Sequence, residues 1–139
     1  MDKYTLRRQL KAARNALKPA ERRHAARASL RLAMRHGLLL RARRIGFYLP
    51  QGGEFDAHPL LNQALMMQRE CYLPVLPRRG RMMRFGRLGR STRMTTNRYG
   101  IPEPLDLKPL RARQLDLLFM PLVGFDQRGY RLGMGGGYY

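Results

Sequence analysis

Four glycines near the end of the chain are spaced so that their backbone amides could bind an anion. They lie in the stretch Arg-Leu-Gly-Met-Gly-Gly-Gly-Tyr-Tyr, which occupies residues 131–139. Glycine has no Cβ and adopts positive φ at little cost, so successive N–H groups can face one phosphate, with the Arg131 side chain supplying charge beside them. The spacing matches neither the P-loop nor the dinucleotide-binding pattern. On these residues alone, a flexible tail or a hairpin turn is an equal alternative.

Two acidic residues follow the first strand that the sequence predicts. That strand covers residues 44–49, and Glu54 and Asp56 come after it in a loop broken by proline and glycine. Ligands commonly bind in loops at the carboxyl ends of strands in α/β sheets. Asp56 is placed to cap the helix predicted for residues 59–68. Glu54 is too far from that helix to cap it, so we expect Glu54 to be the functional carboxylate of the pair.

The first predicted helix carries a basic stripe beside an apolar one. This helix covers residues 3–16, and its apolar residues at helical spacing predict the face that packs inward. The expected inward residues are Leu6, Leu10, Ala13 and Leu17. Arg7, Lys11 and Arg14 form the second stripe. By itself, such a stripe is more typical of a solvated face than of a binding site.

Helices and strands alternate along the rest of the sequence. Pro19 suits the first turn of a second helix, and Gly37 suits its end. Strands are predicted at residues 44–49, 71–75, 81–88 and 116–123. This alternation is typical of an α/β domain with a largely parallel sheet. We therefore expect a single domain over residues 1–139, with helices in residues 3–38 and the sheet with its site loops in residues 44–139.

Basic residues greatly outnumber acidic ones. The chain has 28 Lys and Arg residues against 9 Asp and Glu residues, which gives a formal net charge of +19. Such a charge attracts nucleic acid, an acidic membrane or a phosphorylated substrate without choosing among them. The arginines are spread over the whole sequence, and no zinc-finger, basic-zipper or stacking-aromatic motif accompanies them. A nucleic-acid partner is therefore allowed but not favoured, and an arginine-rich solvated surface is the preferred interpretation.

Cysteine content and hydropathy are informative about the cellular compartment of the protein. The single cysteine, Cys71, excludes an intrachain disulfide framework, and its apolar neighbours favour a buried strand thiol. The sequence shows no secretory leader and no apolar run of roughly 20 residues. Its three histidines are too widely spaced to suggest a metal cluster. We expect a cytoplasmic protein without membrane association.

Several blocks of the sequence together resemble the 5-formyltetrahydrofolate cyclo-ligase family, also called methenyltetrahydrofolate synthetases. The blocks are residues 3–7 with Leu10 and Lys11, residues 45–56, residues 72–75, residues 99–104 (Tyr-Gly-Ile-Pro-Glu-Pro), and residues 121–129 (Pro-Leu-Val-Gly-Phe-Asp-Gln-Arg-Gly) running into residues 131–139. They span nearly the full chain, and the last two are the most specific. The resemblance implies a three-layer α/β/α fold with a mainly parallel, Rossmann-like sheet.

The resemblance also implies an activity. Family members convert 5-formyltetrahydrofolate to 5,10-methenyltetrahydrofolate with ATP and Mg²⁺, and release ADP and phosphate. In the mechanism proposed for the family, the formyl oxygen attacks the γ-phosphate, a folate nitrogen closes the ring on the activated carbon, and phosphate leaves. Because phosphorylation turns a poor leaving group into a good one, such a site mainly has to position and neutralise phosphates.

Residues at matching positions take their expected roles from the resemblance. The implied nucleotide contacts are Lys3, Arg7, Arg131, Leu132, Gly133, Met134, Gly135, Gly136, Gly137, Tyr138 and Tyr139. The implied folate contacts are Glu54, Met134, Gly135, Gly136, Gly137 and Tyr138. Under this interpretation the Arg7 side of the first helix becomes a phosphate clamp, while Lys11 and Arg14 stay on the surface. The implied cofactors are ATP and Mg²⁺, the implied partner is 5-formyltetrahydrofolate, and we expect a monomer.

The sequence departs from the family pattern after Tyr139. Family members continue with an aspartate that binds Mg²⁺, then a helix, further strands and a second acidic metal ligand. We therefore expect the C-terminal part of the fold to be missing, with no metal ligand within residues 1–139, and we assign no catalytic acid, base or nucleophile. Two other functions stay open: a basic RNA-binding protein, and a non-catalytic fragment that binds nucleotide or folate.

Overall fold

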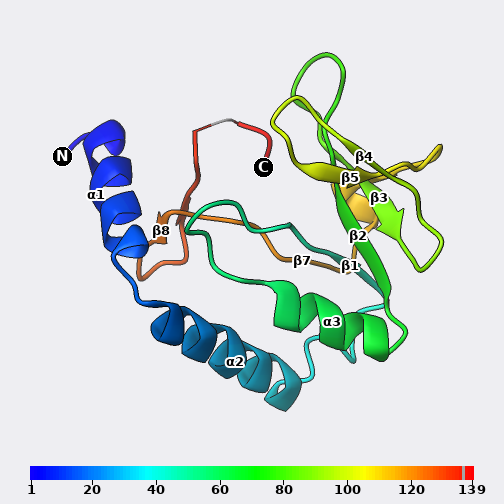
Figure 1. The fold of residues 1–139 in the computed structure, drawn as a ribbon, viewed down its shortest axis with the longest axis horizontal. Helices are drawn as coiled ribbons and strands as arrows, with labels where there is room; N and C mark the ends of the chain where they lie inside the picture. Colours follow the sequence, from blue (N-terminus) through cyan, green and yellow to red (C-terminus); the bar gives the residue numbers. More distant parts are fainter. Residues whose placement is uncertain (136) are drawn as a thin grey trace.

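Helix α1 opens the chain and stands to one side of the sheet (Figure 1). The computed structural model describes residues 1–135 and 137–139. Helix α1 (Lys3–Asn15) begins after Asp2, whose carboxylate accepts a hydrogen bond of 2.7 Å from the N–H of Thr5. That bond satisfies one of the N–H groups left free at the start of a helix. The helix predicted for residues 3–16 is therefore confirmed.

Helix α2 (Pro19–Arg35) follows after a short corner. Its first residue is the proline that the sequence predicts there, and the Glu21 carboxylate accepts a hydrogen bond of 3.0 Å from the N–H of Lys18. Two residues beyond the helix, Gly37 has a φ of 66°, a left-handed conformation that glycine adopts readily at helix ends. Both end signals read from the sequence are confirmed.

The main sheet has five strands in the order β6-β3-β2-β1-β7. They are β1 (Arg44–Gly46), β2 (Glu70–Val75), β3 (Arg84–Leu88), β6 (Leu110–Arg111) and β7 (Leu117–Leu118). Strand β1 pairs in parallel with both β2 and β7, whereas β3 runs antiparallel to β2 and to β6. Helix α3 (His58–Met66) lies between β1 and β2 and makes the crossover that parallel neighbours require. The α/β class is confirmed, with parallel pairing around β1.

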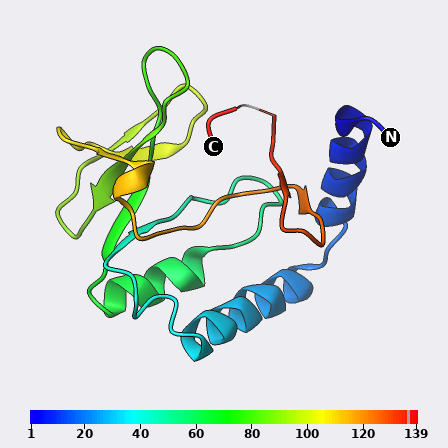
Figure 2. The same cartoon turned by 180° about the vertical axis from the view of Figure 1, so that it is seen from behind.

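Different residues pack against the two faces of the sheet. Ile45, Phe47 and Cys71 pack in one cluster with residues of α2 and α3, which lie side by side below the sheet in Figures 1 and 2. Burial raises the pKa of the Cys71 thiol to about 11, in agreement with the predicted buried thiol. Tyr72 and Phe85 belong to a second cluster on the opposite face. No helix among the described residues packs on that face, so these residues form only one helical layer of the predicted three-layer arrangement.

Two short hairpins lie outside the four strands that the sequence predicts. Strands β4 (Met94–Thr96) and β5 (Pro102–Pro104) pair antiparallel, and so do β8 (Gly124–Phe125) and β9 (Arg131–Leu132). A single 3₁₀ turn, η1 (Ala112–Gln114), precedes β7. None of the described helices is both long and apolar enough to cross a membrane.

The inward face of α1 differs from the prediction. Leu6 and Leu17 are 37% and 44% exposed, and Ala13 is also exposed, so the expected apolar face lies outward. Of that face, only Leu10 is half-buried. The half-buried side instead carries the basic stripe of Arg7, Lys11 and Arg14. The expectation that Arg14 stays on the surface is wrong, because its Nε and Nη1 atoms are buried, whereas Lys11 is half-buried.

Candidate functional site

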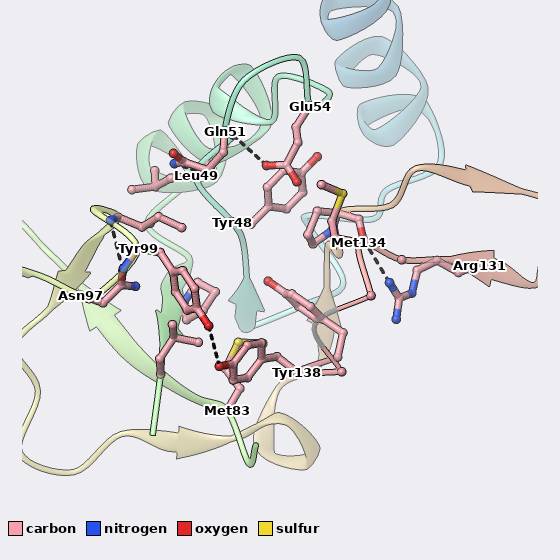
Figure 3. A pocket seen from close by; sticks show the side chains of 18 of the residues that line it. Tyr48, Leu49, Gln51, Glu54, Met83, Asn97, Tyr99, Arg131, Met134 and Tyr138 are labelled. Atoms are coloured by element: carbon pink, nitrogen blue, oxygen red, sulfur yellow. Dashed lines mark hydrogen bonds between the residues drawn. The ribbon is translucent and has the colours of Figure 1, made fainter. Parts of the chain in front are cut away.

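A cleft of about 760 Å³ lies beyond the carboxyl ends of the parallel strands. Tyr48 and Leu49 follow β1, Leu76 follows β2 and Pro121 follows β7, and all four line the cleft. This is where α/β sheets commonly bind ligands, because loops of neighbouring parallel strands meet there. The end of the chain closes another side of the cleft, where Met134 and Tyr138 point inward (Figure 3).

The glycine stretch begins as a hairpin and continues as an open loop against α1. The Nε–H of Arg7 donates a hydrogen bond of 2.9 Å to the carbonyl of Gly133. Gly135 and Gly137 have φ values of 97° and 76°, so two of the glycines adopt the left-handed conformation for which the type is suited. A side chain at Gly135 would also contact the Arg7 guanidinium, whose Cζ would lie 3.7 Å from its Cβ. The hairpin alternative is therefore borne out for residues 131–132, whereas the anion-site hypothesis stays a prediction for Gly133, Gly135 and Gly137.

Arg131 brings a second cation to this end of the cleft. Its Nη1–H donates a hydrogen bond of 3.2 Å to the carbonyl of Pro121, and its guanidinium lies 5.8 Å from the centre of the Tyr139 ring. Both Arg131 and Tyr139 line the cleft, as does Arg7. Two arginines beside glycine-rich backbone are a suitable environment for a polyphosphate.

Most of the predicted nucleotide contacts lie together. The cleft is lined by Arg7, Arg131, Gly133, Met134, Gly135, Gly137, Tyr138 and Tyr139. Lys3 does not line it and is exposed in the first turn of α1, and Leu132 pairs with Gly124 in the β8–β9 hairpin instead. Gly136 lies outside the described residues. Lys3 and Leu132 match the family pattern in sequence, but neither lines the cleft. The packing of α1 and of β9 decides this, and a sequence match alone does not show it.

Glu54 lines the cleft beside Tyr48 (Figure 3) and also shapes its own loop. Its carboxylate accepts a hydrogen bond of 2.7 Å from the N–H of Gln51, and its own N–H donates to the carbonyl of Gln51 at 3.1 Å. Glu54 does not cap α3, as expected, but it has a role within its own turn that the sequence did not indicate. The bond to Gln51 uses Oε1 only, and no described residue bonds to Oε2. Asp56 accepts a hydrogen bond of 3.0 Å from the N–H of His58, the first residue of α3, but the N-cap position is occupied by Ala57, so Asp56 is not the N-cap residue that the sequence predicts.

Tyr48 forms the floor of the cleft beside Glu54 (Figure 3). Its hydroxyl donates a hydrogen bond of 3.0 Å to the carbonyl of Phe55. Burial, followed by the negative charge of Glu54, raises the pKa of Tyr48 to about 12. The phenol therefore stays neutral at physiological pH and offers an aromatic surface rather than a charge.

Tyr138 forms a cluster at the cleft with Arg98 and Tyr99, two residues to which the sequence assigned no role. Arg98 donates a hydrogen bond of 2.7 Å to the hydroxyl of Tyr138, and the hydroxyls of Tyr138 and Tyr99 are 3.2 Å apart. The hydrogen bond with Tyr138, followed by that with Arg98, lowers the pKa of Tyr99. The buried Glu103 holds this hairpin to the sheet, since its carboxylate accepts from the Leu76 N–H at 2.9 Å. The block at residues 99–104 was the signal that could have identified this wall.

The described residues do not form a metal site by themselves. They contain no group of three or more His, Cys, Asp or Glu side chains placed to hold an ion. Glu54 is the one carboxylate among the cleft residues of this part of the chain, and one of its oxygens already binds Gln51. Mg²⁺ usually binds proteins through one or two carboxylates together with substrate phosphates and water. These residues could therefore supply at most a fraction of a magnesium coordination sphere.

The lining of the cleft combines two kinds of chemistry. Arg7, Arg131 and the glycine backbone suit an anion. The apolar and aromatic side chains suit a flat ring, with Glu54 as a hydrogen-bond acceptor among them. The cleft can thus hold a polyphosphate and a heteroaromatic molecule side by side.

The sequence model of the 5-formyltetrahydrofolate cyclo-ligase family matches residues 1–139. The chain belongs to this family. It is 42% identical over 101 residues to the 5-formyltetrahydrofolate cyclo-ligase of Haemophilus influenzae, a match that covers 70% of this chain and 54% of the relative. It is 35% identical over 129 residues to the Escherichia coli cyclo-ligase, covering 91% of this chain and 71% of that relative.

The family's fold is also found in a solved structure. The NMR structure of Aquifex aeolicus 5,10-methenyltetrahydrofolate synthetase matches all of this chain and 70% of the other, with a TM-score of 0.83 and 28% sequence identity. The chain spans about half the length of the Haemophilus relative. It spans about seven-tenths of the Escherichia coli relative and of the Aquifex aeolicus structure. The resemblance read from the glycine stretch and its neighbouring blocks is confirmed at the level of family and fold.

Proposed function

We propose that this chain forms the ATP- and folate-binding cleft of a cyclo-ligase that converts 5-formyltetrahydrofolate to 5,10-methenyltetrahydrofolate with release of ADP and phosphate. The observation that carries the proposal is the pairing of two kinds of surface in one cleft. Arg7 and Arg131 line the cleft beside glycine backbone, and Glu54 lines it beside aromatic side chains. Family membership supports the same activity.

Arg7 and Arg131 are the residues best placed to hold the nucleotide phosphates. Arg7 uses Nε to bind Gly133, which orients its guanidinium and leaves the Nη groups for an anion. The positive φ at Gly135 and Gly137 lets the loop approach a phosphate without a side chain in the way. ATP supplies the phosphoryl group that turns the formyl oxygen into a leaving group. The protein's part is to place both reactants and to balance charge as it moves.

Glu54 and the tyrosines are the residues best placed to hold the folate. The pyrimidine ring of a reduced pterin is flat and carries N–H groups on one edge, so an aromatic wall and a carboxylate acceptor suit it. Tyr48 and Leu49 provide apolar surface beside the free oxygen of Glu54. Because the residues described here do not complete a magnesium site, no step of the proposal assigns them a metal.

The test is an absorbance assay for methenyltetrahydrofolate, with the E. coli relative as positive control. The proposal predicts product that requires both ATP and 5-formyltetrahydrofolate, together with saturable binding of each ligand. Binding without product would identify a non-catalytic folate and nucleotide binder. Binding of neither ligand, with salt-sensitive binding of RNA, would overturn the proposal in favour of a nucleic-acid protein.

A further inference from the structure

The inner side of α1 contacts three separate segments of the cleft. Arg7 binds the carbonyl of Gly133 at one end of the helix. In the middle, Leu10 lies so close to β8 that a Cβ on Gly124 would be 2.6 Å from its Cδ1. At the far end, Asn15 and Arg14 lie against Gly53, where a Cβ would overlap the Asn15 Oδ1 and sit 3.4 Å from the Arg14 Nε. The helix thus rests on two glycines that leave no room for a side chain.

These contacts, rather than an apolar core, hold α1 in place. None of its residues is buried. Arg7 and Arg14 are seven residues apart, so they lie on the same side of the helix, about 10 Å from each other along its axis. A helix behaves as a rigid rod over two turns. A displacement of the helix at Arg7 therefore also displaces the residues at its other end that contact Gly53. Gly53 belongs to the turn that carries Glu54.

Arg14 has two donors that the present arrangement leaves unused. Its Nε and Nη1 are buried, and neither has a hydrogen-bond partner among the described residues. Burying donors without partners is costly, so such atoms are uncommon and point to a second arrangement in which they are satisfied. The residues nearest to them include Gly53 of the Glu54 turn.

We propose that Arg14 is a positioning residue that couples the glycine loop to the Glu54 turn, so that nucleotide and folate strengthen each other's binding through α1. An anion at the glycine loop draws the Arg7 guanidinium toward it and shifts α1 along the cleft. The far end of the helix then moves over Gly53, and the free N–H groups of Arg14 bind the turn and fix Glu54 for the folate. The inference rests on the proposed function, because it requires both ligands to bind this cleft.

Isothermal titration measures this coupling directly. The affinity of the full chain for 5-formyltetrahydrofolate is determined alone and with a saturating non-hydrolysable β,γ-imido analogue of ATP, and the reverse pair is measured as well. The expected result is mutual tightening by the same factor, of about 5-fold or more, because coupling between two sites is reciprocal. In Arg14→Met the factor falls to about 1, while the affinity for the nucleotide alone is unchanged.

Two further variants separate positioning from folding. Arg14→Lys keeps the charge and one mobile donor, and is expected to restore part of the coupling. Gly53→Ala disturbs the contact from the side of the turn, and is expected to lower the coupling with the nucleotide affinity intact, which keeps the test usable if Arg14→Met does not fold. Arg8→Met is the matched control, since Arg8 is exposed on the same helix beside Tyr4.

The outcomes distinguish this inference from the function on which it rests. A parent chain that binds both ligands independently, or an Arg14→Met variant that retains the full factor, overturns the coupling and leaves the proposed function standing. Equal loss of coupling in Arg8→Met also overturns it, since removal of any positive charge from α1 would then have the same effect. A parent chain that binds neither ligand overturns both.

Discussion

Helices α1 and α2 carry basic stripes that look alike in sequence and lie in different surroundings. On α1, Arg7 and Arg14 are half-buried and face the loops of the cleft. On α2, four arginines at intervals of four residues are all exposed: Arg23, Arg27, Arg31 and Arg35. No ion pair joins these four to a carboxylate in the described part of the chain. Arginines aligned along one side of a helix are thus half-buried against loops in α1 and solvated in α2.

The difference arises from what each helix packs against. Helix α2 contributes the buried Ala26 and Ala33 to the core, which leaves its arginines on the opposite side. Helix α1 has no buried residue, and its inward side meets glycines and carbonyl oxygens that long basic side chains can reach. Net charge therefore cannot identify a site in this protein, whereas the partners of each arginine can.

The largest effect is expected from removing the α1 charge at the cleft. Arg7→Met should lower kcat/KM for product formation by about 100-fold, since one of two cations beside the phosphates is lost. Arg27→Met removes an identical charge from α2 and should change kcat/KM by less than about twofold. Steady-state kinetics on both variants checks the pair. Similar losses in the two would show that overall charge, not the cleft, governs activity.

The carboxylate of the cleft should affect one ligand only. Glu54→Gln is expected to weaken 5-formyltetrahydrofolate binding by about 10-fold or more, because a charge-assisted hydrogen bond is replaced by a neutral one. The amide oxygen can still accept from the Gln51 N–H, so the turn should persist. Separate titrations with folate and with ATP measure the two affinities. A larger loss for ATP than for folate would contradict the assignment of Glu54 to the folate.

Alkaline pH should weaken the fold through the cleft floor. The pKa of Tyr48 is about 12 in the folded chain and 10.0 ordinarily, so its contribution to stability is complete below pH 10 and is lost as pH rises toward 12. Tyr48→Phe cannot ionise and should lose less stability over that interval. Urea unfolding on either side of pH 10 gives the comparison. An identical pH dependence in both proteins would show that the Tyr48 hydroxyl is not held neutral by its surroundings.

The smallest effect is expected on the exposed stripe of α2. Arg27→Glu places an acid one turn from both Arg23 and Arg31, and replaces two repulsive pairs by two attractive ones. Such pairs are worth a few tenths of a kcal/mol each, so the free energy of unfolding should rise by about 1 kcal/mol in total. Urea unfolding at low and high salt measures the gain, which salt should screen. A loss of stability would mean that Arg27 has a structural partner.

Local signals in the sequence were enough to predict the helices and the position of the cleft. Pro19 and Gly37 marked α2, and the strand followed by Glu54 marked the carboxyl edge of the sheet. Contacts between distant segments were beyond such signals. The β4–β5 hairpin depends on the bond of Glu103 to Leu76, and periodicity in α1 revealed two faces without showing that the basic one lies inward.

NMR of the arginine Nε–H groups, titrated with ATP, tests nucleotide binding in the cleft most directly. At 139 residues the chain is small enough for each group to be followed separately. Occupancy of the cleft predicts saturable shifts at Arg7 and Arg131, with the α2 arginines Arg23, Arg27, Arg31 and Arg35 unchanged. Equal shifts along α2, or an Arg7 signal that does not move, would contradict the claim that the cleft binds the nucleotide.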